Sequence, residues 1–168
     1  MKMTDEDRLD FKLAGTVRWV PTSLTLVWTW EQTVPAGYVV YLMLIDGDVK
    51  KGGIAKDTPK ASTFKKRMQS EFTTARQVIV GPIPGKPLPK WHLRPLDPFK
   101  KHAPPPLVAG HTVELWAKSC ATAQLMDSEE TRLNSKYRGE WTREGWTRDG
   151  QRLWPVEEQR RSFQTASS

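Results

Sequence analysis

A chain of 168 residues is long enough for one domain with a buried core and too short for two ordinary domains. Its 26 Lys and Arg outnumber its 19 Asp and Glu, and the formal charge of +7 attracts polyanions such as nucleic acid, although many basic proteins bind none. The single cysteine excludes an internal disulfide and a Cys-rich zinc site, and no apolar run reaches the roughly 18 to 20 residues of a membrane helix. We therefore expect a cytoplasmic protein without a membrane partner.

The N-terminal segment combines a polar start with strand-like sequence. Met1 to Asp10 is polar, which predicts a loosely held terminus without a chemical role. The secondary structure of Phe11 to Val20 is ambiguous. Leu24 to Trp30 places large apolar residues at every second position, which predicts a strand. We expect this strand to extend the sheet that the following residues begin.

The segment Gly37 to Gly53 predicts a β-hairpin. Its apolar run Tyr38 to Ile45 is rich in β-branched and aromatic residues, and Asp46-Gly47 suits a tight turn because glycine tolerates a positive φ. If the arms pair across this turn, Tyr41 and Lys51 lie at similar distances from it and can meet near one end of the sheet. A phenol beside an ammonium group is a candidate chemical pair.

A helix is predicted from about Ser62 to Arg76, followed by a short strand, Val78 to Val80. Arg67 lies at the edge of the apolar stripe of this helix. Its head either faces a cleft or reaches into solvent, as many surface arginines do. The stripe recurs at helical spacing and consists of Phe64, Met68 and Phe72.

The stretch from Gly81 to Gly110 is dense in proline, which excludes a regular helix or a central strand and predicts a long surface loop. Basic and aromatic side chains lie between the prolines, a mixture suited to phosphates and bases; the alternative is a packed loop with solvated charges. Other basic residues lie elsewhere in the chain. The candidate nucleic-acid contacts are Lys56, Lys65, Lys66, Lys90, Trp91, Arg94, Lys100, Lys101, Arg143 and Arg148.

A strand and a helix are predicted after this loop. His111 to Ser119 alternates in the manner of a strand, and a helix runs from about Met126 or Asp127 to about Tyr137. Glu130 falls within the buried face of this helix, where a carboxylate needs a paired charge, a bound cation or a cleft. The alternative is that Asp127 and Glu130 form a variant of the capping box, which makes Glu130 a helix-start residue. The expected buried face consists of Met126, Leu133 and Tyr137.

Four segments together resemble the motifs of a known family. They are Gly37 to Tyr41, Lys51-Gly52-Gly53, Thr63 to Met68 and Glu130 to Trp141. In their order and residue types the sequence resembles the GIY-YIG nuclease superfamily, and most closely its restriction-endonuclease-type members with Lys in place of the second tyrosine of the motif. Tyr41 is most similar to the catalytic tyrosine, with Tyr38 as the alternative. The histidine that the family often has four residues after its arginine is Glu71 here, and the asparagine after the glutamate helix is Thr142.

The resemblance implies a fold and a domain arrangement. The implied fold is α+β, with a small three-stranded, mostly antiparallel sheet flanked by helices, an N-terminal extension and a long Pro-rich loop insertion. It implies one nuclease domain over residues 1–160, with a core at about 37–145 and a polar tail at 161–168.

The resemblance also implies a metal-dependent endonuclease that hydrolyses phosphodiester bonds in double-stranded DNA, restriction-like or phage-associated, and compatible with a homodimer. The expected catalytic residues are Tyr41 as general base, Lys51 to tune it, Arg67 on the scissile phosphate and Glu130 on Mg²⁺ or Mn²⁺. Two other classes remain open. One is a non-catalytic nucleic-acid-binding module on the same fold, and the other is a Trp-rich protein-interaction domain whose charge is incidental.

Overall fold

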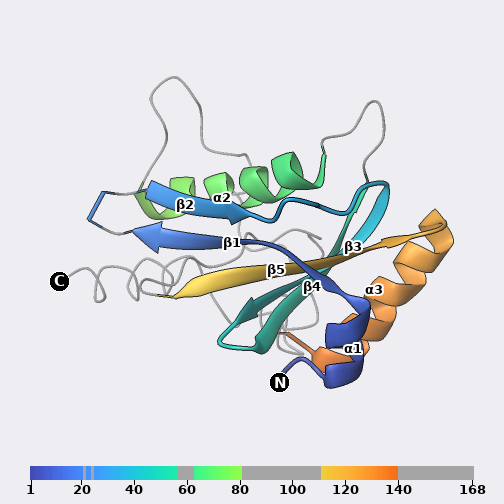
Figure 1. Cartoon of the computed structure of the whole chain (residues 1–168). Helices are drawn as coiled ribbons and strands as arrows, with labels where there is room; N and C mark the ends of the chain where they lie inside the picture. Colours follow the sequence, from blue (N-terminus) through green and yellow to red (C-terminus); the bar gives the residue numbers. More distant parts are fainter. Residues whose placement is uncertain (21, 24, 57–62, 81–110, 140–168) are drawn as a thin grey trace, which may run out of the picture.

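Five strands form one antiparallel sheet in the part of the chain that the structure describes, in the order β2-β1-β5-β3-β4 (Figure 1). The structure is a computed structural model, and it describes residues 1–20, 22–23, 25–56, 63–80 and 111–139. No helix in these ranges is long and apolar enough to cross a membrane. The elements in chain order are α1 (Asp5–Asp10), β1 (Lys12–Val20), β2 (Thr25–Trp30), β3 (Tyr38–Ile45), β4 (Asp48–Lys56), α2 (Phe64–Val80), β5 (Thr112–Cys120) and α3 (Ala123–Tyr137).

The sheet corrects the expected fold: it has five strands and not three, although the fold is α+β as expected. The predicted hairpin is confirmed as β3 and β4, and the predicted strand after the Pro-rich segment is confirmed as β5, which pairs with β3. The other edge of β5 pairs with β1, which in turn pairs with β2. The ambiguous segment Phe11 to Val20 therefore supplies an inner strand. Because an edge strand has unpaired backbone groups that any further strand can pair with, the sequence of the predicted three-stranded core does not determine how many strands the sheet has.

Helices cover both faces of β3, which explains the unbroken apolar run of this strand. Tyr41 and Met43 are buried in the core on the α2 face, and Leu42 and Leu44 in the core that α1 and α3 cover. A strand buried on both faces has no polar side, so its sequence does not alternate. Figure 1 shows α2 on one side of the sheet and α1 and α3 on the other.

Helix α2 confirms the predicted apolar stripe. Phe64, Met68 and Phe72 are at most 2% exposed and belong to one core cluster with the sheet. The short strand predicted at Val78 to Val80 is wrong, because α2 continues through Val80. β-branched residues carry only a small helix penalty, so an established helix runs on through them.

Helix α3 begins earlier than the sequence predicts. Thr122 is its N-cap, and the Oγ1 atom of Thr122 accepts a hydrogen bond from the Leu125 N–H at 3.1 Å. Asp127 and Glu130 therefore lie inside the helix, and the capping-box interpretation of Glu130 is wrong. The predicted buried face is confirmed and consists of Met126, Leu133 and Tyr137.

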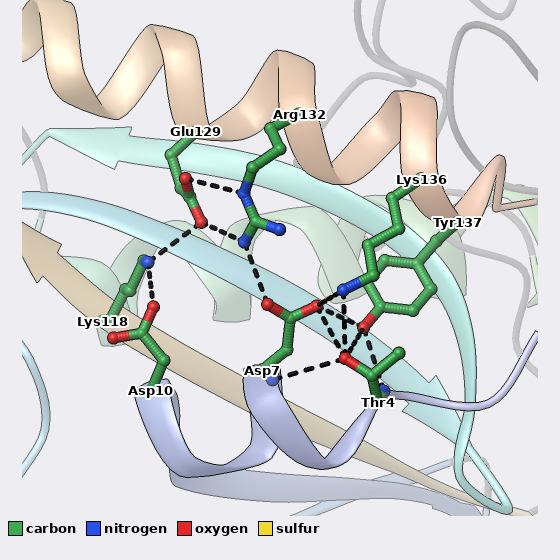
Figure 2. A network of polar contacts seen from close by, with 8 residues as sticks. All are labelled: Thr4, Asp7, Asp10, Lys118, Glu129, Arg132, Lys136 and Tyr137. Atoms are coloured by element: carbon green, nitrogen blue, oxygen red, sulfur yellow. Dashed lines mark hydrogen bonds and ion pairs between the residues drawn. The ribbon is translucent and has the colours of Figure 1, made fainter.

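The expectation of a loosely held N-terminus for the first ten residues is wrong. Thr4 caps α1, and Asp7 within α1 is only 1% exposed. The Asp7 carboxylate accepts hydrogen bonds from Arg132 Nη2 at 2.9 Å, from Lys136 Nζ at 2.8 Å and from the Tyr137 hydroxyl (Figure 2). Burial alone would raise the pKa of Asp7, but these donors outweigh burial and hold the pKa well below its usual value.

The same group of contacts continues to β5. Lys118 pairs with Asp10 at the end of α1 and, at 2.9 Å, with Glu129 of α3, which also pairs with Arg132. The polar N-terminal sequence is thus part of a tertiary ion-pair cluster, which is why its composition alone gave the wrong expectation. We call this cluster the Asp7 network; Figure 2 shows its members, Thr4, Asp7, Asp10, Lys118, Glu129, Arg132, Lys136 and Tyr137.

Candidate active site

A β-bulge in the β3–β4 hairpin decides which side chains share a face. The register shifts next to the pair Met43 and Lys51, where Lys50 is the extra residue on β4. A shift of one residue turns every following side chain to the other face of a sheet. Without the bulge Lys51 would lie opposite Leu42 and face α3. With it, Lys51 lies on the α2 face, together with Tyr41.

Tyr41 reaches the edge strand by lying across a glycine. Its partner on β4 is Gly53, and a Cβ at this position would overlap the ring and the hydroxyl of Tyr41. Gly139, which follows the C-cap Arg138 of α3, likewise has no room for a side chain beside the backbone of Lys50 and Lys51. These two glycines allow the phenol and the end of α3 to approach β4 closely.

Three side chains converge on the carboxylate of Glu71 on α2. The Tyr41 hydroxyl donates to Oε1 at 3.1 Å, and Lys51 Nζ donates to Oε2 at 3.3 Å. Arg67, one turn earlier on α2, places its Nε 3.4 Å from Oε1. The side chains of Lys51 and Glu71 are 8% and 11% exposed, whereas that of Arg67 is 39% exposed. We call Tyr41, Lys51, Arg67 and Glu71 the Glu71 cluster.

The Glu71 cluster combines a surplus positive charge with a protonated phenol. Lys51 and Arg67 are two cations around one carboxylate, an arrangement suited to an additional anionic group such as a phosphate. Burial raises the pKa of Tyr41 and the negative charge of Glu71 raises it further, whereas Arg67 lowers it. Tyr41 is therefore a neutral phenol. To act as a base, it must lose its own proton as it accepts one from another group.

Glu130 acts on this cluster from the opposite face of the sheet. It lies half-buried on α3, and its negative charge contributes to the raised pKa of Tyr41. The link between Glu130 and the Glu71 cluster is therefore electrostatic.

The described residues fit a divalent metal ion only in a shared site. They include no group of three or more His, Cys, Asp or Glu side chains that could hold a metal. Mg²⁺ is commonly bound through one or two carboxylates, with substrate phosphates and water completing its shell. Glu130 supplies one carboxylate within electrostatic range of Tyr41, which fits an ion held jointly by the protein and a phosphate.

The other predicted site residues fall into three sets. Tyr38, the alternative base, lies an odd number of residues from Tyr41, so it points to the opposite face, where it is 37% exposed. Lys56 ends β4, and Lys65 and Lys66 lie in the first turn of α2; all three are exposed. The predictions for Lys90, Trp91, Arg94, Lys100, Lys101, Thr142, Arg143, Arg148 and the 161–168 tail lie outside the described residues.

Sequence reasoning missed the position of Glu71. It treated Glu71 as a departure from the histidine of the resembled family and left the tuning of Tyr41 to Lys51. The available signal was the spacing, because Glu71 lies four residues after Arg67 and directly before the apolar Phe72. This places a carboxylate at the border of the buried stripe, next to the arginine.

Known proteins give no further guide to the site. Comparisons with protein-family models, with curated proteins and with solved structures find no match to this chain. Its function must therefore be inferred from the side chains and their geometry.

Proposed function

We propose that this protein is a magnesium-dependent endonuclease that hydrolyses phosphodiester bonds in double-stranded DNA. The observation that carries the proposal is the convergence of Tyr41, Lys51 and Arg67 on Glu71, with the charge of Glu130 acting on the same phenol. Phosphodiester hydrolysis needs an acceptor for the water proton, cations against the phosphoryl oxygens and a ligand for a hard metal ion. These side chains supply each part, and their order in the sequence is the one that resembles GIY-YIG nucleases.

Each side chain suits one part of the reaction. Arg67 contacts Glu71 through Nε, and its exposed guanidinium can offer further N–H donors to the scissile phosphate. Lys51 is held beside Glu71 and adds a second positive charge next to the phosphate. Tyr41 takes the proton of the attacking water. Mg²⁺, when bound at Glu130 together with the phosphate, supplies charge stabilisation for the phosphoryl and departing oxygens.

The surface of the described residues supports a polyanionic substrate. Lys56, Lys65 and Lys66 are exposed, and the whole chain carries a formal charge of +7. Duplex DNA is the substrate class that we infer, cut by a restriction-like or phage-associated enzyme in the cytoplasm. A homodimer would place one site on each strand of such a duplex.

Cleavage of unmodified duplex DNA of high sequence complexity tests the proposal. The protein should cut it with Mg²⁺ and leave it intact with a chelator. Glu130→Ala should cut at least about 100-fold more slowly, because it loses a metal ligand, while its DNA affinity is retained. Glu31→Ala, an exposed position outside the cluster, is the matched control and should cut like the wild type. Full activity of Glu130→Ala would overturn the metal assignment, and a wild type that cuts no DNA would overturn the function.

A non-catalytic nucleic-acid-binding module is the second candidate. Two observations favour it: Tyr41 is a neutral phenol, and the described ranges contain no group of three or more His, Cys, Asp or Glu side chains that could hold a metal. Such a module would bind DNA with an affinity that falls steeply as the salt concentration rises, and it would leave the DNA uncut. Absence of both cleavage and salt-dependent binding would contradict both candidates.

A further inference from the structure

The two oxygens of Glu71 have separate partners. Oε1 accepts the hydrogen bond of the Tyr41 hydroxyl at 3.1 Å and lies 3.4 Å from Arg67 Nε, and Oε2 accepts Lys51 Nζ at 3.3 Å. Ion pairing alone accounts for the lysine and the arginine. The phenol adds a hydrogen bond of its own, and it aims its single proton at the carboxylate.

We propose that Glu71 is the proton acceptor of Tyr41, a positioning residue that lets a neutral phenol serve as the base. This inference rests on the proposed nuclease function. As the water oxygen bonds to phosphorus, one of its O–H bonds breaks and the proton moves to Tyr41 Oη. The proton that Tyr41 already carried moves along the 3.1 Å hydrogen bond to Glu71 Oε1. The P–O bond to the departing oxygen breaks, that oxygen takes a proton from solvent, and Glu71 later returns its proton to solvent.

The charges around Glu71 favour this transfer during the reaction and not before it. In the resting cluster, Lys51 and Arg67 are paired with the Glu71 carboxylate. When Glu71 gains the proton it becomes neutral, and both cations lose their counter-ion just as negative charge grows on the phosphoryl oxygens. The stabilisation by these cations is therefore greater in the transition state than in the ground state, which is the condition for rate acceleration.

Glu71→Gln separates this role from a structural one. Glutamine keeps the shape and a carbonyl acceptor for Tyr41, but it does not take up a proton as a carboxylate does. We expect single-turnover cleavage to fall about 100- to 1000-fold near neutral pH, with DNA affinity equal to or above that of the wild type because one negative charge is removed. Glu31→Gln removes an exposed negative charge elsewhere and should cleave at the wild-type rate.

The pH profile gives a readout that a structural role would not move. Among the described residues, the charged groups that contact or act on Tyr41 and Glu71 are Lys51 of β4, Arg67 of α2 and Glu130 of α3. All three are unchanged in Glu71→Gln. Without an internal acceptor Tyr41 must release its proton to solvent, so the variant's rate should rise about tenfold per pH unit where the wild-type rate is level.

The possible outcomes distinguish failure of the proton relay from failure of the proposed nuclease function. A cleaving wild type with a Glu71→Gln variant of equal rate, or of lower rate with an unchanged pH profile, overturns the relay and leaves the nuclease intact. A wild type that cuts no DNA overturns the function itself. If the glutamine variant does not fold, Glu71→Asp retains a proton-accepting carboxylate and should keep the level profile at a reduced rate; a steep profile would contradict the relay.

Discussion

The Asp7 network and the Glu71 cluster use the same chemical groups on opposite sides of one sheet. Each places a tyrosine hydroxyl, a lysine and an arginine around a buried carboxylate. Three donors to Asp7 come from α3 and a fourth, the Thr4 hydroxyl, comes from the N-cap of α1, whereas the donors to Glu71 come from β3, β4 and α2. The same set of residue types can therefore fasten two helices together or form a site, so residue types alone do not identify function.

Charge balance separates the two clusters. In the Asp7 network three carboxylates, Asp7, Asp10 and Glu129, meet three cations contributed by two lysines and an arginine. Its charges cancel, which suits a permanent structural contact. The Glu71 cluster itself has two cations and one carboxylate, so it can accept an anionic group when the proposed metal ion offsets the charge of Glu130. We therefore expect substitutions in the first to change stability and those in the second to change catalysis.

The largest expected contrast is between two lysines. Lys51→Met should reduce cleavage about 10³-fold, because the proposed phosphate site loses a cation while an apolar stem of similar length remains. Lys136→Met should cleave like the wild type and lose only about 1 kcal/mol of unfolding free energy, because the Lys136 side chain is partly exposed. Single-turnover rates and denaturant unfolding of both variants check this. Similar cleavage by the two variants would remove the distinction between the clusters.

Asp7→Asn should show the reverse pattern. It removes the buried negative charge that accepts hydrogen bonds from Arg132, Lys136 and Tyr137. This costs about 3 kcal/mol of unfolding free energy, the lower end for a broken buried pair. The folded fraction should retain wild-type cleavage. A loss of activity without a loss of stability would show that the N-terminal helix takes part in the chemistry.

Gly52 and Gly53 of β4 allow the two faces of the sheet to be compared, because Gly53 lies against Tyr41 and Gly52 against Asn134 of α3. A Cβ on Gly53 would overlap the Tyr41 ring, so Gly53→Ala should displace the phenol, cost about 1 to 3 kcal/mol and slow cleavage. A Cβ on Gly52 would lie 2.7 Å from Asn134 Oδ1, the end of a side chain that can turn aside, so Gly52→Ala should have the smaller effect. Unfolding and cleavage assays on the pair measure this difference, and equal effects would argue against the close packing of Tyr41.

The last contrast concerns the acid dependence of stability. The pKa of Asp7 in the folded protein lies below the usual value of 3.8, so its contribution to stability is present above that pH and is lost as the pH falls toward the folded pKa. Asp7→Asn should therefore lose less stability than the wild type over the same acid range. Unfolding free energies of both proteins at several acidic pH values test this, and parallel curves would contradict it.

Local patterns in the sequence predicted most of the elements around the candidate site. The apolar run before Asp46-Gly47 predicted the hairpin, and the spacing of Phe64, Met68 and Phe72 predicted the buried face of α2. These patterns depend on neighbours within a turn or a strand, so one sequence is enough to detect them.

The features that were missed depend on contacts between distant segments. Asp7 and Tyr137 are 130 positions apart, so nothing near Asp7 in the sequence indicates that its carboxylate is buried. The bulge at Lys50 turns Lys51 toward α2, and only the paired strand reveals that shift. For Glu71, the helical spacing from Arg67 could be read from the sequence. Its contacts with Tyr41 and Lys51 on the sheet could not, because they depend on the strand register.

The central claim is that the Glu71 cluster is reactive and the Asp7 network is structural. Its most direct test replaces one tyrosine in each by phenylalanine: Tyr41 in the Glu71 cluster and Tyr137 in the Asp7 network. Tyr41→Phe should cut duplex DNA with Mg²⁺ at least about 100-fold more slowly than the wild type. Tyr137→Phe should cut at the wild-type rate. Its free energy of unfolding should fall by about 1 to 2 kcal/mol, because Asp7 and Thr4 lose a buried hydroxyl partner. Wild-type cleavage by Tyr41→Phe, or an equal loss of cleavage in both variants, would contradict the claim.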